Sequence, residues 1–255
     1  MLIFHHIPKT AGTSFVDLLR QNYSEAELLC PYDESAGGAE REWYEVLLRE
    51  HPRLRCVAAH SAHHLIPLLT ARGAPCEVVS FLRDPVQRCV SLYFFVRELG
   101  ARGEPNQGGL AGRFLLERNW SLADIYQHAD ALSASPERRM VAAFFDGQAR
   151  AILAPYRHRL PFTQAPIAAA DAERLEQAIA EYDFGVCEQY DESVLRWARR
   201  FGWRTLPSER KNVGESRQRA DPVSEEVADL IRSYNRVDVD LHARASARAG
   251  FRPAP

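Results

Sequence analysis

The first twenty residues constrain the fold of this chain more than any other stretch. Residues 2–7 form a short apolar run that predicts a buried strand. Residues 8–13 contain one glycine and predict a turn. From Ser14 onward, apolar residues recur at helical spacing. The chain is therefore expected to open as a strand, a glycine-containing loop and a helix.

This arrangement predicts an anion-binding site. A strand–loop–helix turn aims backbone N–H groups and the positive end of a helix dipole at one point. Lys9 adds a mobile cation, and the hydroxyls of Thr10, Thr13 and Ser14 add donors. A Walker A loop has its lysine directly after its last glycine, whereas Lys9 precedes Gly12 here. The loop is P-loop-like, but it is not that motif.

A second candidate anion site follows the strand predicted at residues 76–82. The sequence Arg-Asp-Pro-Val-Gln-Arg-Cys-Val-Ser-Leu-Tyr starts at Arg83, and its proline suits the first turn of a helix. Ser91 lies about two turns along that helix. A guanidinium is a natural bidentate partner for phosphate. For Asp84 and Arg88 we expect a local structural ion pair.

The densest histidine cluster follows the strand predicted at residues 55–60. His60 ends that strand, and His63 and His64 come directly after it. A metal site is disfavoured because no Cys, Asp or Glu falls at ligand spacing. A histidine at the carboxyl end of a parallel strand lies on the edge where α/β folds bind ligands. The pattern favours a role in ligand chemistry.

Together these motifs resemble the sulfotransferases that use 3′-phosphoadenosine-5′-phosphosulfate (PAPS). The similarity is to the carbohydrate sulfotransferase group that includes the heparan sulfate 2-O-sulfotransferases. The string His-Ile-Pro-Lys-Thr-Ala-Gly-Thr-Ser at residues 6–14 is similar to the family's 5′-phosphosulfate loop. Arg83 and Ser91 match its 3′-phosphate motif. The resemblance runs with gaps from residue 4 to residue 241, and outside the two nucleotide motifs it is loose.

The resemblance implies which residues hold the nucleotide. Lysine, loop amides and hydroxyls would bind the phosphosulfate, an arginine and a serine would bind the 3′-phosphate, and a late basic loop would close over the nucleotide. The residues so assigned are Lys9, Thr10, Ala11, Gly12, Thr13, Ser14, Arg83, Ser91, Arg210 and Lys211. Lys9 would also be catalytic, because it would stabilise the charge that develops on the leaving group.

The resemblance also implies a general base and an acceptor. In this family a histidine after the second strand takes the proton of the acceptor hydroxyl, and His60 stands in the matching place. The family has glycine before this histidine and this chain has Ala59, so His63 stays a competitor. The acceptor would be a hydroxyl of a sugar or glycan, the nucleotide product would be 3′-phosphoadenosine 5′-phosphate (PAP), and no metal is expected.

Composition limits the other possibilities. The 255 residues suffice for one large α/β domain with a full core. A formal net charge of −2 gives no global field for nucleic acid. No run approaches 18 consecutive apolar residues, so no membrane span is expected. With no signal peptide and five cysteines outside any CxxC spacing, we expect reduced thiols and a cytoplasmic location.

The expected fold is a single α/β domain with a central, mostly parallel sheet and helices on both faces. Residues 1–241 would form the sulfotransferase domain, and residues 242–255 a frayed tail. Residues 97–113 hold five glycines and predict a mobile loop at the acceptor-binding edge. A final amphipathic helix is predicted at residues 223–241.

Two other functions stay open from the sequence. An ATP-dependent phosphotransferase would share the P-loop-like opening, but the chain offers no Walker lysine, and Asp84 is the nearest candidate for a magnesium ligand. A non-catalytic nucleotide-binding module is the second alternative, against which Lys9 and the strand-end histidine argue.

Overall fold

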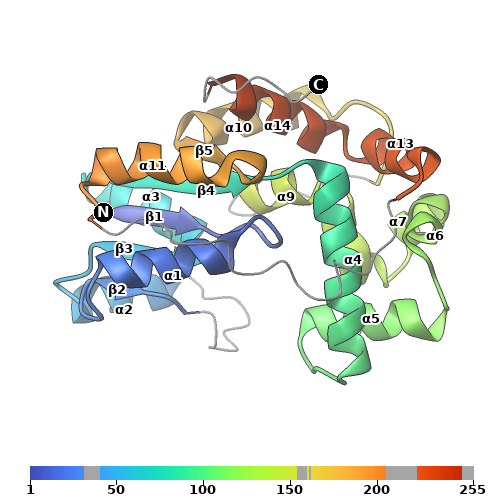
Figure 1. Ribbon diagram of the computed structural model, residues 1–255, viewed down its shortest axis with the longest axis horizontal. Helices are drawn as coiled ribbons and strands as arrows, with labels where there is room; N and C mark the ends of the chain where they lie inside the picture. Colours follow the sequence, from blue (N-terminus) through green and yellow to red (C-terminus); the bar gives the residue numbers. More distant parts are fainter. Residues whose placement is uncertain (32–40, 154–159, 161, 205–222, 249–255) are drawn as a thin grey trace.

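A five-stranded, all-parallel sheet organises the molecule in the computed structural model (Figure 1), which describes residues 1–31, 41–153, 160, 162–204 and 223–248. The strand order is β2-β3-β1-β4-β5. The strands are β1 (Leu2–His5), β2 (Leu28–Leu29), β3 (Cys56–Ala59), β4 (Glu77–Leu82) and β5 (Tyr182–Val186). The predicted α/β class and parallel sheet are confirmed. The predicted nucleotide ligands Arg210 and Lys211 lie outside the described residues.

The apolar opening strand is the centre of this sheet. All four residues of β1 are buried, as expected for a strand covered on both faces. Its Leu2 lies opposite Cys56 of β3 on one side and Glu77 of β4 on the other. The short β2 extends the sheet beyond β3.

Helices α1 (Gly12–Asn22) and α11 (Tyr190–Phe201) cover one face of the sheet through an aromatic cluster. Phe15 of α1 lies at its centre, with ring centroids 4.6 Å from Phe4 and 5.2 Å from both Phe81 and Trp197. Edge-on contacts of this kind add to the burial of apolar area. The cluster fixes α1, and with it the loop that precedes α1, against the strands.

Five of the described helices cover the opposite face, which confirms the prediction of helices on both faces. They are α2 (Arg41–Glu50), α3 (Leu65–Ala71), α9 (Gly147–Leu153), α10 (Ala169–Ala180) and α14 (Arg236–Arg248). Their buried side chains meet Ile3, Val57 and Val78 of the central strands. The alternation of Ile3 with Phe4, one residue on each face, is the period-2 pattern of a strand.

The other helices of the described ranges form a third cluster beyond the carboxyl ends of the strands, seen at the right of Figure 1. They are α4 (Pro85–Ala101), α5 (Gln107–Glu117), α6 (Leu122–Gln127), α7 (Ala129–Ala134), α8 (Arg138–Val141) and α13 (Glu225–Tyr234). No helix of the described ranges is long and apolar enough to cross a membrane.

The glycine-rich stretch at residues 97–113 is mostly helical, so the prediction of a mobile loop is wrong. It contains the end of α4 and the start of α5. A Cβ added to Gly100 would overlap the backbone of Gly112, and one added to Gly112 would overlap the carbonyl group of Val96. The glycines thus allow two helix backbones to cross at close range, which a single-sequence pattern does not distinguish from a loop.

The C-terminal prediction is also corrected. The stretch predicted as one helix breaks at Asn235, whose side chain accepts from the Asp146 N–H at 2.7 Å and donates to the Ile231 carbonyl at 2.9 Å. The expected frayed tail begins inside α14, which continues to Arg248 and buries Leu241 and Ala245. Contacts with distant residues therefore decide both where the predicted helix breaks and how far α14 continues.

Removal of the Phe15 ring is expected to destabilise the fold by about 3–5 kcal/mol, because the ring is fully buried and its loss leaves a cavity. Chemical denaturation of Phe15→Ala measures this change. Phe95→Ala removes the same ring from a 40% exposed position and is expected to cost less than about 1 kcal/mol. Equal losses in the two variants would contradict the described packing.

Candidate functional site

Three predicted site residues converge at one edge of the sheet. Strands β3, β1 and β4 are adjacent and parallel, so the segments that leave their carboxyl ends share that edge. The Arg83 Nη1 donates to the Lys9 carbonyl at 3.2 Å. The His60 Nδ1 lies 2.5 Å from the carbonyl oxygen of His6. The expected convergence of Lys9, His60 and Arg83 is thus confirmed.

The loop after β1 has an unusual backbone. Lys9 and Ala11 have φ angles of 70° and 63°, in the left-handed region that non-glycine residues rarely occupy. Such conformations cost on the order of 1–3 kcal/mol each and concentrate at ligand-binding turns. Helix α1 begins at Gly12, two residues earlier than the pattern predicts, and Ala11 is its N-cap. Ala11 makes no side-chain cap hydrogen bond, and a helix start of this kind directs its first amides toward an anion.

The predicted hydroxyl donors differ in where they lie. Thr10 is fully buried and its hydroxyl donates to the Ile7 carbonyl at 2.7 Å, so it braces the loop from inside. Thr13 is exposed and Ser14 is half-buried, both on the first turn of α1. The surface at this turn therefore offers Thr13 and Ser14, rather than Thr10, as side-chain donors.

Lys9 has an aromatic neighbour that the sequence analysis did not single out. Its ammonium nitrogen lies 3.9 Å from the ring centroid of Phe95, an attractive cation–π geometry. Phe95 follows Ser91 by four residues on α4, so both share one face of that helix. This i,i+4 spacing from Ser91, a predicted ligand of the 3′-phosphate, is the sequence signal that could have pointed to Phe95. The half-buried Ser91 and the exposed Phe95 place this face of α4 beside the loop.

Arg83 is only 8% exposed and its backbone is held on both sides. Its N–H donates to the Gln148 Oε1, and its carbonyl accepts from the Gln148 Nε2, each at 2.9 Å. Its guanidinium reaches the Lys9 carbonyl. Gln148 has no sequence signal, because it comes from a distant part of the chain.

Asp84 and Arg88 have structural roles, but not as the predicted ion pair. Asp84 is the N-cap of α4 and accepts from the Gln87 N–H at 2.9 Å. Arg88 is buried, with its Nε donating to the Pro8 carbonyl at 3.2 Å and its Nη1 to the Ala143 carbonyl at 2.9 Å. Asp84 is used to cap the N-terminal amides of α4, and Arg88 is used to bind backbone carbonyl groups.

His60 has the geometry of a neutral base. Its ring stacks on His6 with centroids 4.3 Å apart and an interplanar angle of 24°. A carbonyl oxygen accepts only, so Nδ1 carries the proton toward His6, and Nε2 of the neutral ring keeps its lone pair. Desolvation by the surrounding atoms lowers the pKa of His60, although the hydrogen bond to the His6 carbonyl opposes this. The residue nevertheless retains an exposed surface.

His63 belongs instead to a buried row of interacting side chains. Its Nδ1 lies 3.3 Å from the His5 Nε2, and the His5 Nδ1 lies 2.8 Å from the Tyr182 hydroxyl. His63 is 7% exposed, and burial, with the nearby His64, lowers its pKa to about 3. A group with so low a pKa is a weak proton acceptor. The geometry therefore favours His60 over His63 as a base.

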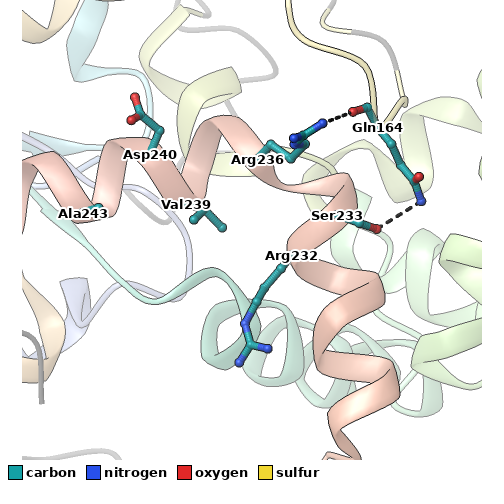
Figure 2. Close-up of a pocket in the computed structure, with 7 residues that line it drawn as sticks. All are labelled: Gln164, Arg232, Ser233, Arg236, Val239, Asp240 and Ala243. Atoms are coloured by element: carbon teal, nitrogen blue, oxygen red, sulfur yellow. Dashed lines mark hydrogen bonds between the residues drawn. The ribbon is translucent and has the colours of Figure 1, made fainter. Parts of the chain in front are cut away.

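The described residues contain no group of three or more His, Cys, Asp or Glu side chains that could hold a metal ion. A hollow of about 590 Å³ lies at the junction of α13 and α14 (Figure 2). Its arginines are already engaged: Arg236 donates to the Gln164 carbonyl, and Arg232 donates to Glu225 and Asp229. None of the predicted site residues that the structure describes lines this hollow.

The comparisons with known proteins add no relative. No protein-family model matches the chain, and no curated protein matches it. A functional conclusion must therefore come from the residues and their geometry.

Gly12 tests how closely the loop and the histidine pair are coupled. A Cβ added there would overlap the His6 ring, on which His60 stacks. We expect Gly12→Ala to displace His6, to destabilise the fold by about 1–3 kcal/mol and to shift the ring resonances of His60. Denaturation and histidine NMR measure both effects, and an unchanged His60 spectrum would contradict the coupling.

Proposed function

We propose that this protein is a PAPS-dependent sulfotransferase that sulfates a hydroxyl group, with a carbohydrate as the acceptor class. One observation carries the proposal: a helix-start anion loop with Lys9 and an arginine, Arg83, leave adjacent parallel strands and contact each other. PAPS has anionic groups at both its 5′ and 3′ positions, and such a nucleotide needs two neighbouring cationic sites. The sulfotransferase-like motifs of the sequence supply the assignment of each site.

In the proposed reaction, the acceptor oxygen attacks the sulfur in line with the leaving group. A new S–O bond forms as the S–O bond to the phosphate oxygen breaks, and PAP leaves. Negative charge develops on that bridging oxygen. Lys9 and the first amides of α1 would stabilise it, because donors fixed in place need little reorganisation during the reaction. Lys9 would first have to leave the ring of Phe95.

His60 would accept the proton of the acceptor hydroxyl at Nε2. Its Nδ1 contact with the His6 carbonyl fixes the ring and the tautomer. Its lowered pKa keeps the imidazole neutral at pH 7, which is the form that can act as a base.

Two further observations support this proposal over an ATP-dependent phosphotransferase. Asp84, the nearest candidate for a magnesium ligand, is used as a helix cap. Arg83 adds a phosphate-binding group that the polyphosphate of ATP does not require. None of the five cysteines forms a disulfide, which suits the cytoplasmic location included in the proposal.

Arg83→Ala is expected to weaken PAP binding about 10- to 100-fold and adenosine 5′-phosphate (AMP) binding much less, because only PAP has the 3′-phosphate. Isothermal titration with both ligands measures the difference. Arg83→Lys keeps the charge but loses the bidentate geometry, so we expect an intermediate loss. Equal weakening of PAP and AMP would mean that Arg83 does not contact a 3′-phosphate.

His60→Ala is expected to reduce transfer of labelled sulfate from PAPS about 100- to 10,000-fold while PAP affinity is unchanged. A panel of glycans serves as acceptors, and His63→Ala is the matched control. In the wild type, kcat/KM should be flat above pH 6.5, since the lowered pKa of His60 keeps the ring neutral there, and should fall only at lower pH. A greater loss in His63→Ala, or a rate midpoint above pH 6.5, would assign the base elsewhere.

A further inference from the structure

Gln148 continues the hydrogen-bond pattern of the sheet at the point where β4 ends. The last pair between β4 and β5 is Leu82 with Val186. Arg83 comes next, and the fully buried carboxamide of Gln148 bonds both its N–H and its carbonyl at 2.9 Å. A carboxamide has both a donor and an acceptor, as a strand backbone does. It therefore fixes the peptide plane from which the Arg83 side chain departs.

Gln148 is itself fixed by the C-terminal helix. The buried carboxylate of Asp238 accepts from the N–H groups of Gln148 at 3.0 Å and Ala149 at 2.8 Å, at the start of α9. In return, Asp146 accepts from the N–H groups of Val237 at 3.0 Å and Asp238 at 3.1 Å, at the start of α14. The two helix starts cap each other. Asp238 thus holds the start of α9, and Asp146 holds the start of α14.

The same unit reaches the anion loop. Arg83 donates to the Lys9 carbonyl, and Arg88 donates to the Pro8 carbonyl. Gly147, at the start of α9, lies so close to Arg88 that an added Cβ would come within 2.6 Å of its guanidinium nitrogens. The chain of contacts runs from α14 through α9 and the end of β4 to the loop after β1.

From these contacts we infer that Gln148 is the positioning residue for nucleotide selection. It orients Arg83 toward the 3′-phosphate of the nucleotide, and Asp238 holds Gln148 in register. This inference rests on the proposed function. Gln148 touches no ligand in this account, so its loss acts through Arg83 and selectively reduces the preference for a 3′-phosphorylated nucleotide.

The test compares PAP and AMP by isothermal titration in the wild type, Gln148→Glu and Gln148→Leu. An ionised glutamate can accept from the Arg83 N–H but cannot donate to its carbonyl, and leucine does neither. We expect the PAP-to-AMP affinity ratio to fall about 3-fold in Gln148→Glu and about 10-fold or more in Gln148→Leu. Gln148→Glu also serves if the leucine variant does not fold.

Ser193→Ala is the matched structural control. Its buried hydroxyl accepts from the Val186 N–H at 3.1 Å and donates to the Gln189 carbonyl at 2.9 Å, beside the neighbouring strand end. This variant should lower the melting temperature and leave the PAP-to-AMP ratio unchanged. If the Gln148 variants lower stability but keep the wild-type ratio, as Ser193→Ala should, Gln148 is only structural and the inference is wrong.

The wild-type ratio separates this inference from the proposed function. A wild type that does not prefer PAP to AMP has no 3′-phosphate site, so the proposed function fails and the inference fails with it. A wild type that prefers PAP, with variants that keep the preference, overturns the inference alone.

Discussion

Two buried arginines hold the loop on which the proposed chemistry depends. Arg83 and Arg88 donate to the carbonyl groups of Lys9 and Pro8, the two residues that begin the turn after the central strand. These contacts oppose the backbone strain of a lysine at positive φ. With the carbonyls drawn toward the arginines, the amides of the next turn start helix α1. The anion site is therefore built by long-range contacts onto a local strand–loop–helix unit.

The histidine arrangement depends on the same loop. His6 lies between the strand and the turn, and its ring lies close to Gly12 and stacks on His60. Burial, together with the nearby His60 and Lys9, keeps the pKa of His6 well below its usual value, so His6 adds no positive charge to the stack. The loop that would bind the leaving group and the histidine that would take the proton are thus one packed unit.

The sequence predicted those features of the fold that depend on local residue patterns and on the direction of the strands. The buried β1, the parallel sheet and the shared edge for Lys9, His60 and Arg83 follow from periodicity and from the geometry of parallel strands. The glycines of residues 97–113 predicted a loop, but Gly100 and Gly112 instead allow the backbones of α4 and α5 to approach closely. A local sequence pattern does not show such a contact between two helices. The break at Asn235 depends on the distant Asp146, and no local pattern reveals such a partner.

The most direct test of the central claim is an isothermal titration of the wild-type protein with PAP and, in parallel, with ADP and magnesium. The account predicts tight binding of PAP and negligible binding of ADP, because Arg83 and Ser91 would recognise a 3′-phosphate that ADP lacks. Tight, magnesium-dependent binding of ADP with negligible binding of PAP would contradict it, and would identify the site as that of a phosphotransferase.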